Sequence, residues 1–212
     1  MSSAQPPSPP SPPSPPSPPS HSSLPRLPPQ YAFLAEEPGP RILTEALYLY
    51  GVLEAPGAAD NPRILAWAKE LGINYYTHDS VSWCGLFAGI CSRRAGIAPP
   101  RNLLHALSWS HWGVPVPDAG LGDILTFERG GIPSQPESER PGHVGIYVGE
   151  DTTTYHVLGG NQSDQVRVSR ILRSRLNSAR RSPGPVGGNV RRIIFSSGQG
   201  QSQGVEVSKN EA

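Results

Sequence analysis

The sequence has few cysteines, little net charge and no long hydrophobic run, and each shortage excludes a class of protein. Two cysteines among 212 residues cannot supply a disulfide framework. A formal charge of +1 gives no global field for binding nucleic acid. No apolar run reaches the length of a membrane span, and the N-terminus lacks the basic segment and apolar core of a secretory signal. We therefore expect a soluble monomer made in the cytoplasm; the sequence does not indicate a route to any external target.

Proline, by contrast, is abundant, and its distribution divides the chain. Half of the 26 prolines precede residue 31, and Pro-Pro-Ser repeats between Pro6 and Ser20. Such repeats favour polyproline II, which buries nothing. We interpret residues 1–30 as a disordered spacer, with a ligand for proline-binding modules as the alternative. Residues 196–212 are polar and glycine-rich and predict a disordered tail, so residues 31–195 are expected to form one domain.

Helical patterns come first in this domain, and strand patterns follow. Apolar residues recur at helical spacing from Ile42 to Leu53, and a second helix is predicted to start at Asn61-Pro62 and stop at Gly72. Short β-rich runs then predict strands at 122–127, 142–149, 153–161, 165–169 and 190–195. Helices followed by antiparallel strands predict an α+β domain.

Cys84 stands where a polar stretch gives way to a helical pattern. The unpaired N–H groups and the dipole of a helix start stabilise a thiolate, so we expect the pKa of this thiol to be lowered. Cys91 would lie two turns further along, roughly 10 Å away, which is too far for a disulfide, and we interpret it as a core residue. Asp79 is expected to cap the helix, with a contact in an oxyanion hole as the alternative.

A nucleophilic cysteine needs a base, and His143 is the best placed of the six histidines. It begins a strand directly after Pro141-Gly142, where a rigid backbone can aim the imidazole into a cleft. His105 and His111 are interpreted as surface or groove residues, because no histidine or cysteine pair has the spacing of a metal site. The sequence therefore predicts a Cys84–His143 dyad.

Three stretches of the sequence form a recognisable set: Trp83-Cys84 at a helix start, the Gly122-Asp123-Ile124 strand, and the strand Gly142-His143-Val144-Gly145-Ile146-Tyr147-Val148-Gly149. Together they resemble the NlpC-type papain-like cell-wall hydrolases and the related CHAP amidases and endopeptidases. The segment from Leu158 to Ser163, together with Trp109 and Trp112, is similar to a branch found in phage and prophage lysis or tail proteins. The resemblance covers about Ile42 to Phe195. It implies a papain-like fold, in which N-terminal helices, including the cysteine-bearing one, pack on an antiparallel sheet.

The same resemblance implies a reaction and its residues. Cys84 would attack an amide carbonyl in peptidoglycan as a thiolate, His143 would act as general acid/base, and no metal or organic cofactor is implied. A third polar residue would orient the imidazole. NlpC-type members usually carry a histidine near the place of His156, and CHAP-type members often carry a polar residue where Asn161 stands. Strand alternation favours Asn161 over His156 unless a bulge intervenes, so both stay open.

Two functions of other kinds remain alternatives at this point. A structural or binding component of a virion or secretion apparatus could keep the fold without turnover. Thiol-dependent acyl transfer on a lipid or protein amide would use the same residues in a different cleft. The dyad separates hydrolase from scaffold, because a scaffold has no need of Cys84 and His143 together. Whether an endopeptidase or an amidase bond is cut depends on the groove, which the sequence does not define.

Overall fold

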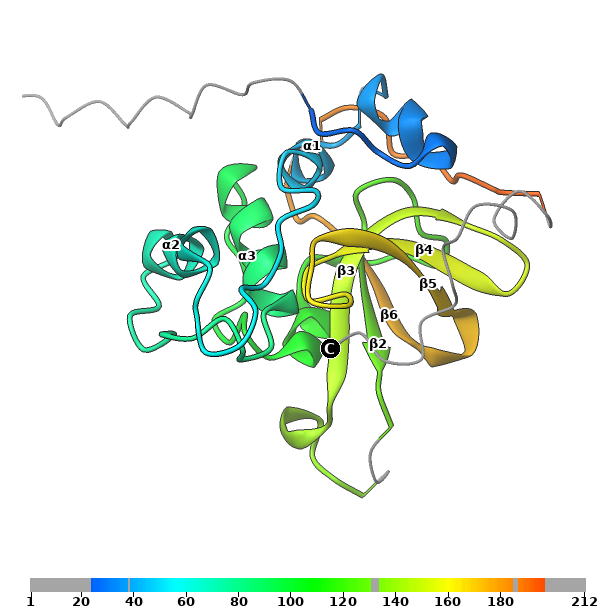
Figure 1. Cartoon of the computed structure of the whole chain (residues 1–212). Coiled ribbons are helices and arrows are strands. Elements are labelled where there is room, and N and C mark those ends of the chain that lie inside the picture. Colours follow the sequence, from blue (N-terminus) through cyan, green and yellow to red (C-terminus); the bar gives the residue numbers. More distant parts are fainter. Residues whose placement is uncertain (1–23, 38, 131–133, 185–186, 197–212) are drawn as a thin grey trace, which may run out of the picture.

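The computed structural model describes residues 24–37, 39–130, 134–184 and 187–196. In this part of the chain, helices pack against a six-stranded antiparallel sheet (Figure 1). The prediction of an α+β domain, with the cysteine-bearing helix against an antiparallel sheet, is confirmed. Most of the predicted spacer and nearly all of the predicted tail, residues 1–23 and 197–212, lie outside the described residues.

The helices lie mainly in the first half of the chain. The second one begins as the sequence predicts, because the side chain of Asn61 accepts a hydrogen bond from the N–H of Arg63 at 2.8 Å and Pro62 takes the first helical position. The described helices are η1 (Pro29–Ala35), α1 (Arg41–Leu47), α2 (Pro62–Glu70), α3 (Cys84–Arg94), η2 (Ala106–His111), η3 (Glu137–Glu139) and η4 (Arg173–Arg175), where η marks a 3-10 helix.

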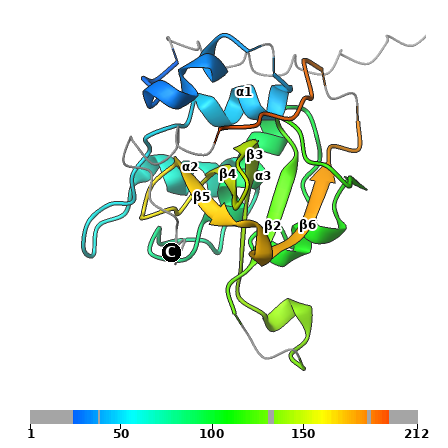
Figure 2. The same cartoon turned by 90° about the vertical axis from the view of Figure 1, so that its right-hand side faces the viewer.

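The sheet has the strand order β1-β6-β2-β3-β4-β5, so β3 lies inside it between β2 and β4 (Figure 2). Every pairing in it is antiparallel. The strands are β1 (Val114–Pro115), β2 (Ile124–Glu128), β3 (Gly142–Glu150), β4 (Thr154–Gly159), β5 (Arg167–Leu172) and β6 (Leu176–Arg181).

One predicted strand is wrong, and two strands, β6 and the two-residue β1, were not predicted. Residues 190–195 form no strand; they make an isolated bridge between Ile194 and Glu150. They cannot close the sheet beside β3, because β2 and β4 already occupy both edges of β3. The free edge of β2 is instead paired by β6, an arginine-containing segment without the apolar alternation that marks a half-buried strand.

Alternate residues of the strands build two cores, one on each face of the sheet. Val144, Ile146 and Leu158 belong to the larger core, which includes the buried residues of α1, α2 and α3. Phe127 and Tyr147 belong to the smaller core on the other face. Among the described residues, no helix is long and apolar enough to cross a bilayer.

The segments at both ends of the described chain pack on the larger core. Leu27 is buried, so packed residues begin before the boundary expected at residue 31. Tyr31 is fully buried and its ring meets that of Phe195 edge-on, with 5.8 Å between the ring centroids. The blue and orange segments at the top of Figure 1 are these two ends. A bidentate pair between Glu37 and Arg191 joins them again at the surface.

Candidate active site

Cys84 is the first residue of α3, and no side chain caps this helix. Trp83 occupies the N-cap position without a capping hydrogen bond. The predicted capping role of Asp79 is wrong, because its carboxylate accepts hydrogen bonds from the backbone N–H groups of Ala55 (2.9 Å) and Asn61 (2.8 Å). Asp79 therefore fastens two loops together. The first-turn N–H groups of α3 keep their capacity to bind an oxygen atom.

The Cys84 thiol lies inside the protein, with 2% of the residue exposed. Burial raises its pKa, while the backbone N–H of Val144, the Ser82 hydroxyl and the charge of Arg129 act to lower it. The expected lowering of the pKa is thus opposed by burial, which disfavours the thiolate. The Ser82 oxygen is 3.8 Å from the sulfur. A thiol in this setting needs a nearby base to take its proton.

His143 is the residue before Val144 on β3, so the strand that contacts the thiol also carries the imidazole. His143 is fully buried, and its Nε2 lies 3.1 Å from Oε1 of Gln162. The amide nitrogen of Gln162 donates to the carbonyls of Val157, Gly159 and Arg167. These acceptors fix the amide with its oxygen toward the ring. Nε2 must then carry the hydrogen, and Nδ1 holds the lone pair of the neutral imidazole.

Two glycines let the backbone pass between the histidine and the cysteine helix. A Cβ on Gly159 would lie 3.0 Å from Nε2 of His143. A Cβ on Gly160 would lie 2.7 Å from the ring of Trp83 and 2.5 Å from Cβ of Phe87. Neither position has space for a side chain without displacing its neighbours. The chain at and just after the end of β4 therefore lies against His143 and against the start of α3.

The loop after β4 has an unusual backbone. Asn161, Ser163 and Asp164 have φ values of 56°, 52° and 57°, the left-handed region that side chains other than glycine seldom adopt. Strained backbone of this kind often accompanies functional sites. The Asn161 amide nitrogen is 3.5 Å from the Ser82 hydroxyl, so this side chain faces the thiol side of the site.

Gln162 was missed in the sequence. Strand alternation predicts side-chain direction only as far as Gly159, where β4 ends, and left-handed residues then redirect the chain. A polar residue just after a Gly-Gly pair is the one local signal that could have drawn attention to it.

His156, the other candidate for the third position, lies on the opposite face of β4. Its Nδ1 is 2.8 Å from the Tyr31 hydroxyl and its Nε2 is 3.1 Å from Asp151. Its ring stacks on Phe195 with centroids 4.5 Å apart. Both ring nitrogens are engaged there, so His156 is not available to orient His143.

Other residues singled out in the sequence have structural surroundings. Cys91 is buried and forms no disulfide with Cys84. Trp109 and Trp112 are buried, and their indole N–H groups donate to backbone carbonyls at 2.9 and 2.8 Å. Both are residues of the larger core.

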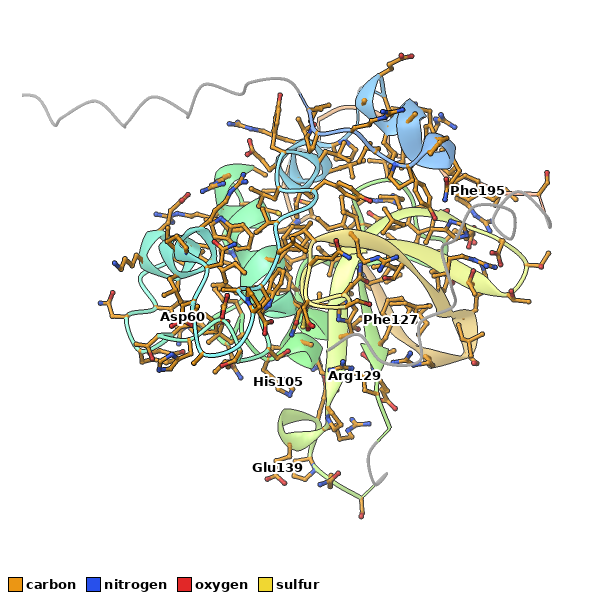
Figure 3. All side chains as sticks on the ribbon, in the orientation of Figure 1. Asp60, His105, Phe127, Arg129, Glu139 and Phe195 are labelled. Carbon is orange, nitrogen blue, oxygen red and sulfur yellow. The ribbon has the colours of Figure 1, made fainter. Side chains whose placement is uncertain are left out.

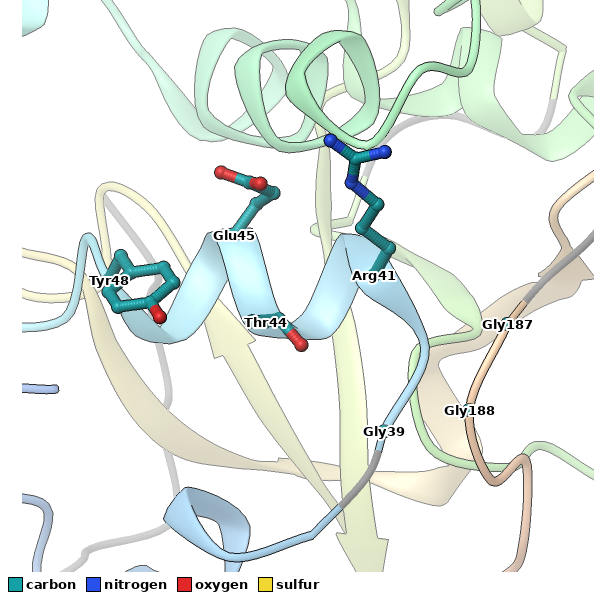
Figure 4. Close-up of a pocket in the computed structure, with 7 residues that line it drawn as sticks. All are labelled: Gly39, Arg41, Thr44, Glu45, Tyr48, Gly187 and Gly188. Atoms are coloured by element: carbon teal, nitrogen blue, oxygen red, sulfur yellow. The ribbon is translucent and has the colours of Figure 1, made fainter. Parts of the chain in front are cut away.

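One hollow in the structure lies away from the candidate site. It has a volume of about 390 Å³, and Figure 4 shows its lining: Gly39, Arg41, Thr44, Glu45, Tyr48, Gly187 and Gly188. No residue of the candidate site belongs to it. Within the described ranges, no three histidine, cysteine or acidic side chains gather as they would around a metal ion.

No family model matches the chain, and no curated protein matches it in sequence. Among solved structures, it is similar to a Staphylococcus aureus subsp. aureus Mu50 protein described as similar to lipoprotein, NLP/P60 family. The two are 18% identical, with a TM-score of 0.39 over 77% of this chain. The match spans 45% of the other protein, so less than half of its length has a counterpart here.

Proposed function

We propose that the chain is a cysteine-dependent hydrolase that cleaves amide bonds in peptidoglycan, with Cys84 as nucleophile and His143 as general acid/base. One observation carries the proposal. The strand start that bears His143 also brings the N–H of Val144 to the Cys84 thiol, while Gln162 fixes the imidazole from its other side. A structural cysteine has no need of this arrangement.

The proposed reaction follows from the hydrogen bonds. With its hydrogen on Nε2, the imidazole can accept the Cys84 proton at Nδ1, and the thiolate then attacks the amide carbonyl. The uncapped N–H of Cys84 is a donor for the oxyanion that forms. The Nδ1 proton passes to the leaving amine, which breaks the C–N bond. Water activated by His143 then hydrolyses the thioester and regenerates the thiol.

The choice of peptidoglycan rests on the motif resemblance around Cys84 and His143. Placement in the phage or prophage branch, and a role as an endolysin, stay predictions from the segment after Gly159. The orienting role is now assigned to Gln162, with Asn161 on the thiol side of the same loop.

The test is release of soluble fragments from purified peptidoglycan, followed by mass spectrometry. Cys91→Ala is the matched control for Cys84→Ala, because both cysteines are buried on α3. We expect the wild type and Cys91→Ala to cut and Cys84→Ala to be inactive, and the product masses to distinguish endopeptidase from amidase. If the wild type releases nothing from several peptidoglycan chemotypes, the hydrolase proposal fails and a structural role replaces it.

A further inference from the structure

The hollow beside α1 is separate from the candidate active site. Its helical lining residues follow one another at intervals of three or four, so they share one side of the helix: Arg41, Thr44, Glu45 and Tyr48. In Figure 1, α1 lies above the sheet. Figure 3 has the same orientation and places Phe127, the β2 partner of His143, well below α1. A molecule bound in the hollow would therefore not contact the Cys84–His143 pair.

The rest of the lining comes from glycines that hydrogen bonds hold in place. The side chains of Asn189 and Arg191 donate to the carboxylate of Glu37 at 3.1 and 2.8 Å. These bonds tie the segment after Gly188 to the segment before Gly39, and both glycines line the hollow. A wall without side chains lets a bound molecule approach the backbone closely. Because the wall is already fixed, binding would cost little ordering.

Glu45 is a buried charge without a partner. Only 8% of this residue is exposed, and within the described ranges its side chain takes part in no hydrogen bond and no ion pair. Arg94 on α3 is influenced by the charge of Glu45, but its guanidinium is held by both oxygens of Glu70, at 3.0 and 2.7 Å. A buried carboxylate without a donor is costly in free energy. Glu45 would therefore gain from a cationic donor that enters the hollow.

Arg41 supplies the opposite charge one helical turn earlier. Its side chain is exposed and, like that of Glu45, has no partner in the part of the chain that the structure describes. Figure 4 shows both side chains extending from the same side of α1. A glutamate four residues after a basic residue is the less favourable order for an ion pair along a helix. The guanidinium also disfavours a metal cation at Glu45, so the hollow offers one anion and one cation to a ligand.

We propose that this hollow binds a small zwitterion, a free amino acid or a short peptide. Its ammonium group donates to Glu45, and its carboxylate accepts from Arg41. An ammonium group has three donors for the unsatisfied carboxylate, and the guanidinium fork matches a carboxylate. The volume of about 390 Å³ suits a molecule of this size. The inference is independent of the proposed hydrolase, because no residue of the candidate active site lines the hollow.

The first experiment titrates ligands into the full-length protein labelled with nitrogen-15 and follows the amide signals of Gly39, Gly187 and Gly188 by NMR. L-alanine and L-alanyl-L-alanine are the two zwitterions, and the one with the lower Kd identifies amino acid or peptide as the better ligand. N-acetyl-L-alanine lacks the ammonium group and should bind about tenfold more weakly than L-alanine. L-alaninamide lacks the carboxylate and should bind about threefold more weakly, because Arg41 is exposed. The absence of a saturable shift with both zwitterions would overturn the proposal.

The second experiment repeats the titrations with variants that each remove one charge. Glu45→Gln should bring the Kd ratio of N-acetyl-L-alanine to L-alanine near one and leave the L-alaninamide ratio unchanged, whereas Arg41→Gln should do the converse. Glu139→Gln and Arg101→Gln are the matched controls, because both residues are exposed and lie outside the lining, and they should keep the wild-type ratios.

Thermal melts without ligand distinguish binding from a structural role of Glu45. Glu45→Gln should melt no lower than the wild type, because it removes a buried charge that has no partner. A lower melting temperature together with wild-type Kd ratios would mean that Glu45 acts in folding alone, and would overturn the proposal.

Discussion

Two buried histidines on neighbouring strands of one sheet have different surroundings. His143 is held at Nε2 by a neutral amide and lies on the strand that contacts a thiol. His156 is held at both nitrogens, by the Asp151 carboxylate and the Tyr31 hydroxyl, and is covered by Phe195. In the first arrangement one ring nitrogen, Nε2, is held by Gln162, and the other, Nδ1, is the one that we propose exchanges a proton with the thiol. The second uses the ring to join β4 to both ends of the described chain.

The carboxylate in the second cluster is stabilised by several donors. Burial alone would raise the pKa of Asp151, but hydrogen bonds from Thr154, Thr153 and His156 outweigh it and hold the pKa below its ordinary value. Arg170 adds an ion pair at 2.8 Å. Burial lowers the pKa of His156, although Asp151 partly offsets this. The proposed function places catalysis in the first cluster, whereas the contacts of the second give it a role in stability, and the predictions below test that division.

The largest effect should come from His143→Ala. Loss of the general base is expected to reduce kcat/KM at least about 100-fold, because the buried thiol then has no nearby group to take its proton. The melting temperature should also fall, because the buried ring and its hydrogen bond with Gln162 are lost, so activity is to be scaled by the folded fraction. Fragment release and thermal melts measure the two quantities on the same preparation. A variant with normal activity would remove His143 from the mechanism.

Gln162→Leu should be the next most damaging to activity. Without Oε1, the imidazole loses the acceptor that selects its tautomer, and a fall of about 10- to 100-fold in kcat is expected. The unpaired carbonyls of Val157, Gly159 and Arg167 should also lower stability, so activity is to be scaled by the folded fraction. The pH dependence of kcat distinguishes the two effects. A variant that is only less stable would keep the wild-type pH dependence, whereas a variant with a misoriented imidazole would not.

Gly159→Ala probes the same ring by crowding. The new methyl group would meet Nε2 of His143 at 3.0 Å and the Gln162 amide at 2.9–3.0 Å, so we expect about a tenfold loss of activity. Gly184→Ala is the control, because a Cβ there meets no atom within 4 Å. Equal activities of the two variants would show that the ring tolerates displacement.

His156→Leu should lower the stability of the protein and leave its activity intact. Removing the ring takes one buried hydrogen-bond partner from the Asp151 carboxylate and one from the Tyr31 hydroxyl, at a cost of about 2–4 kcal/mol in the free energy of unfolding. Activity per folded molecule should be retained. Denaturant unfolding and fragment release at a temperature below both melts provide the comparison. A catalytic loss in the fully folded variant would contradict the division between the two histidines.

A smaller effect is expected in the pH dependence of stability. The pKa of His156 is lower in the folded protein than its ordinary 6.5, so the unfolded chain binds the proton more readily. The stability from the neutral ring is complete above pH 6.5 and is lost as pH falls through the folded pKa. Asp151 adds a further loss below its ordinary pKa of 3.8, because its folded pKa is lowered. Melts between pH 7.5 and 5 should show the slope due to His156 in the wild type and not in His156→Leu.

Much of the fold could be predicted because apolar periodicity reports burial directly. The start of α2 at Asn61-Pro62, the start of α3 at Cys84 and the long strand β3 followed from such patterns. The strand β6 did not, since hydrogen bonds and pairs such as Arg181 with Asp123 hold it in place of an apolar face. Long-range charge pairs leave no periodic trace in a sequence.

The candidate site, like the fold, could be predicted only in part. Cys84 and His143 were recognisable because each stands at the start of an element, where local sequence defines direction. Gln162 was not, because three left-handed residues around it decide where its side chain points. The burial that raises the pKa of Cys84 comes from residues far apart in the chain, so it could not be predicted from the sequence around Cys84 either.

The most direct test of the central claim is the pH dependence of Cys84 alkylation by iodoacetamide, in a Cys91→Ala background. The wild type should react well below the ordinary thiol pKa of about 8.5, because His143 accepts the proton. His143→Ala should react only at higher pH, where a lone thiol with a pKa raised by burial ionises, and His156→Leu should match the wild type. Identical profiles for wild type and His143→Ala would contradict the account.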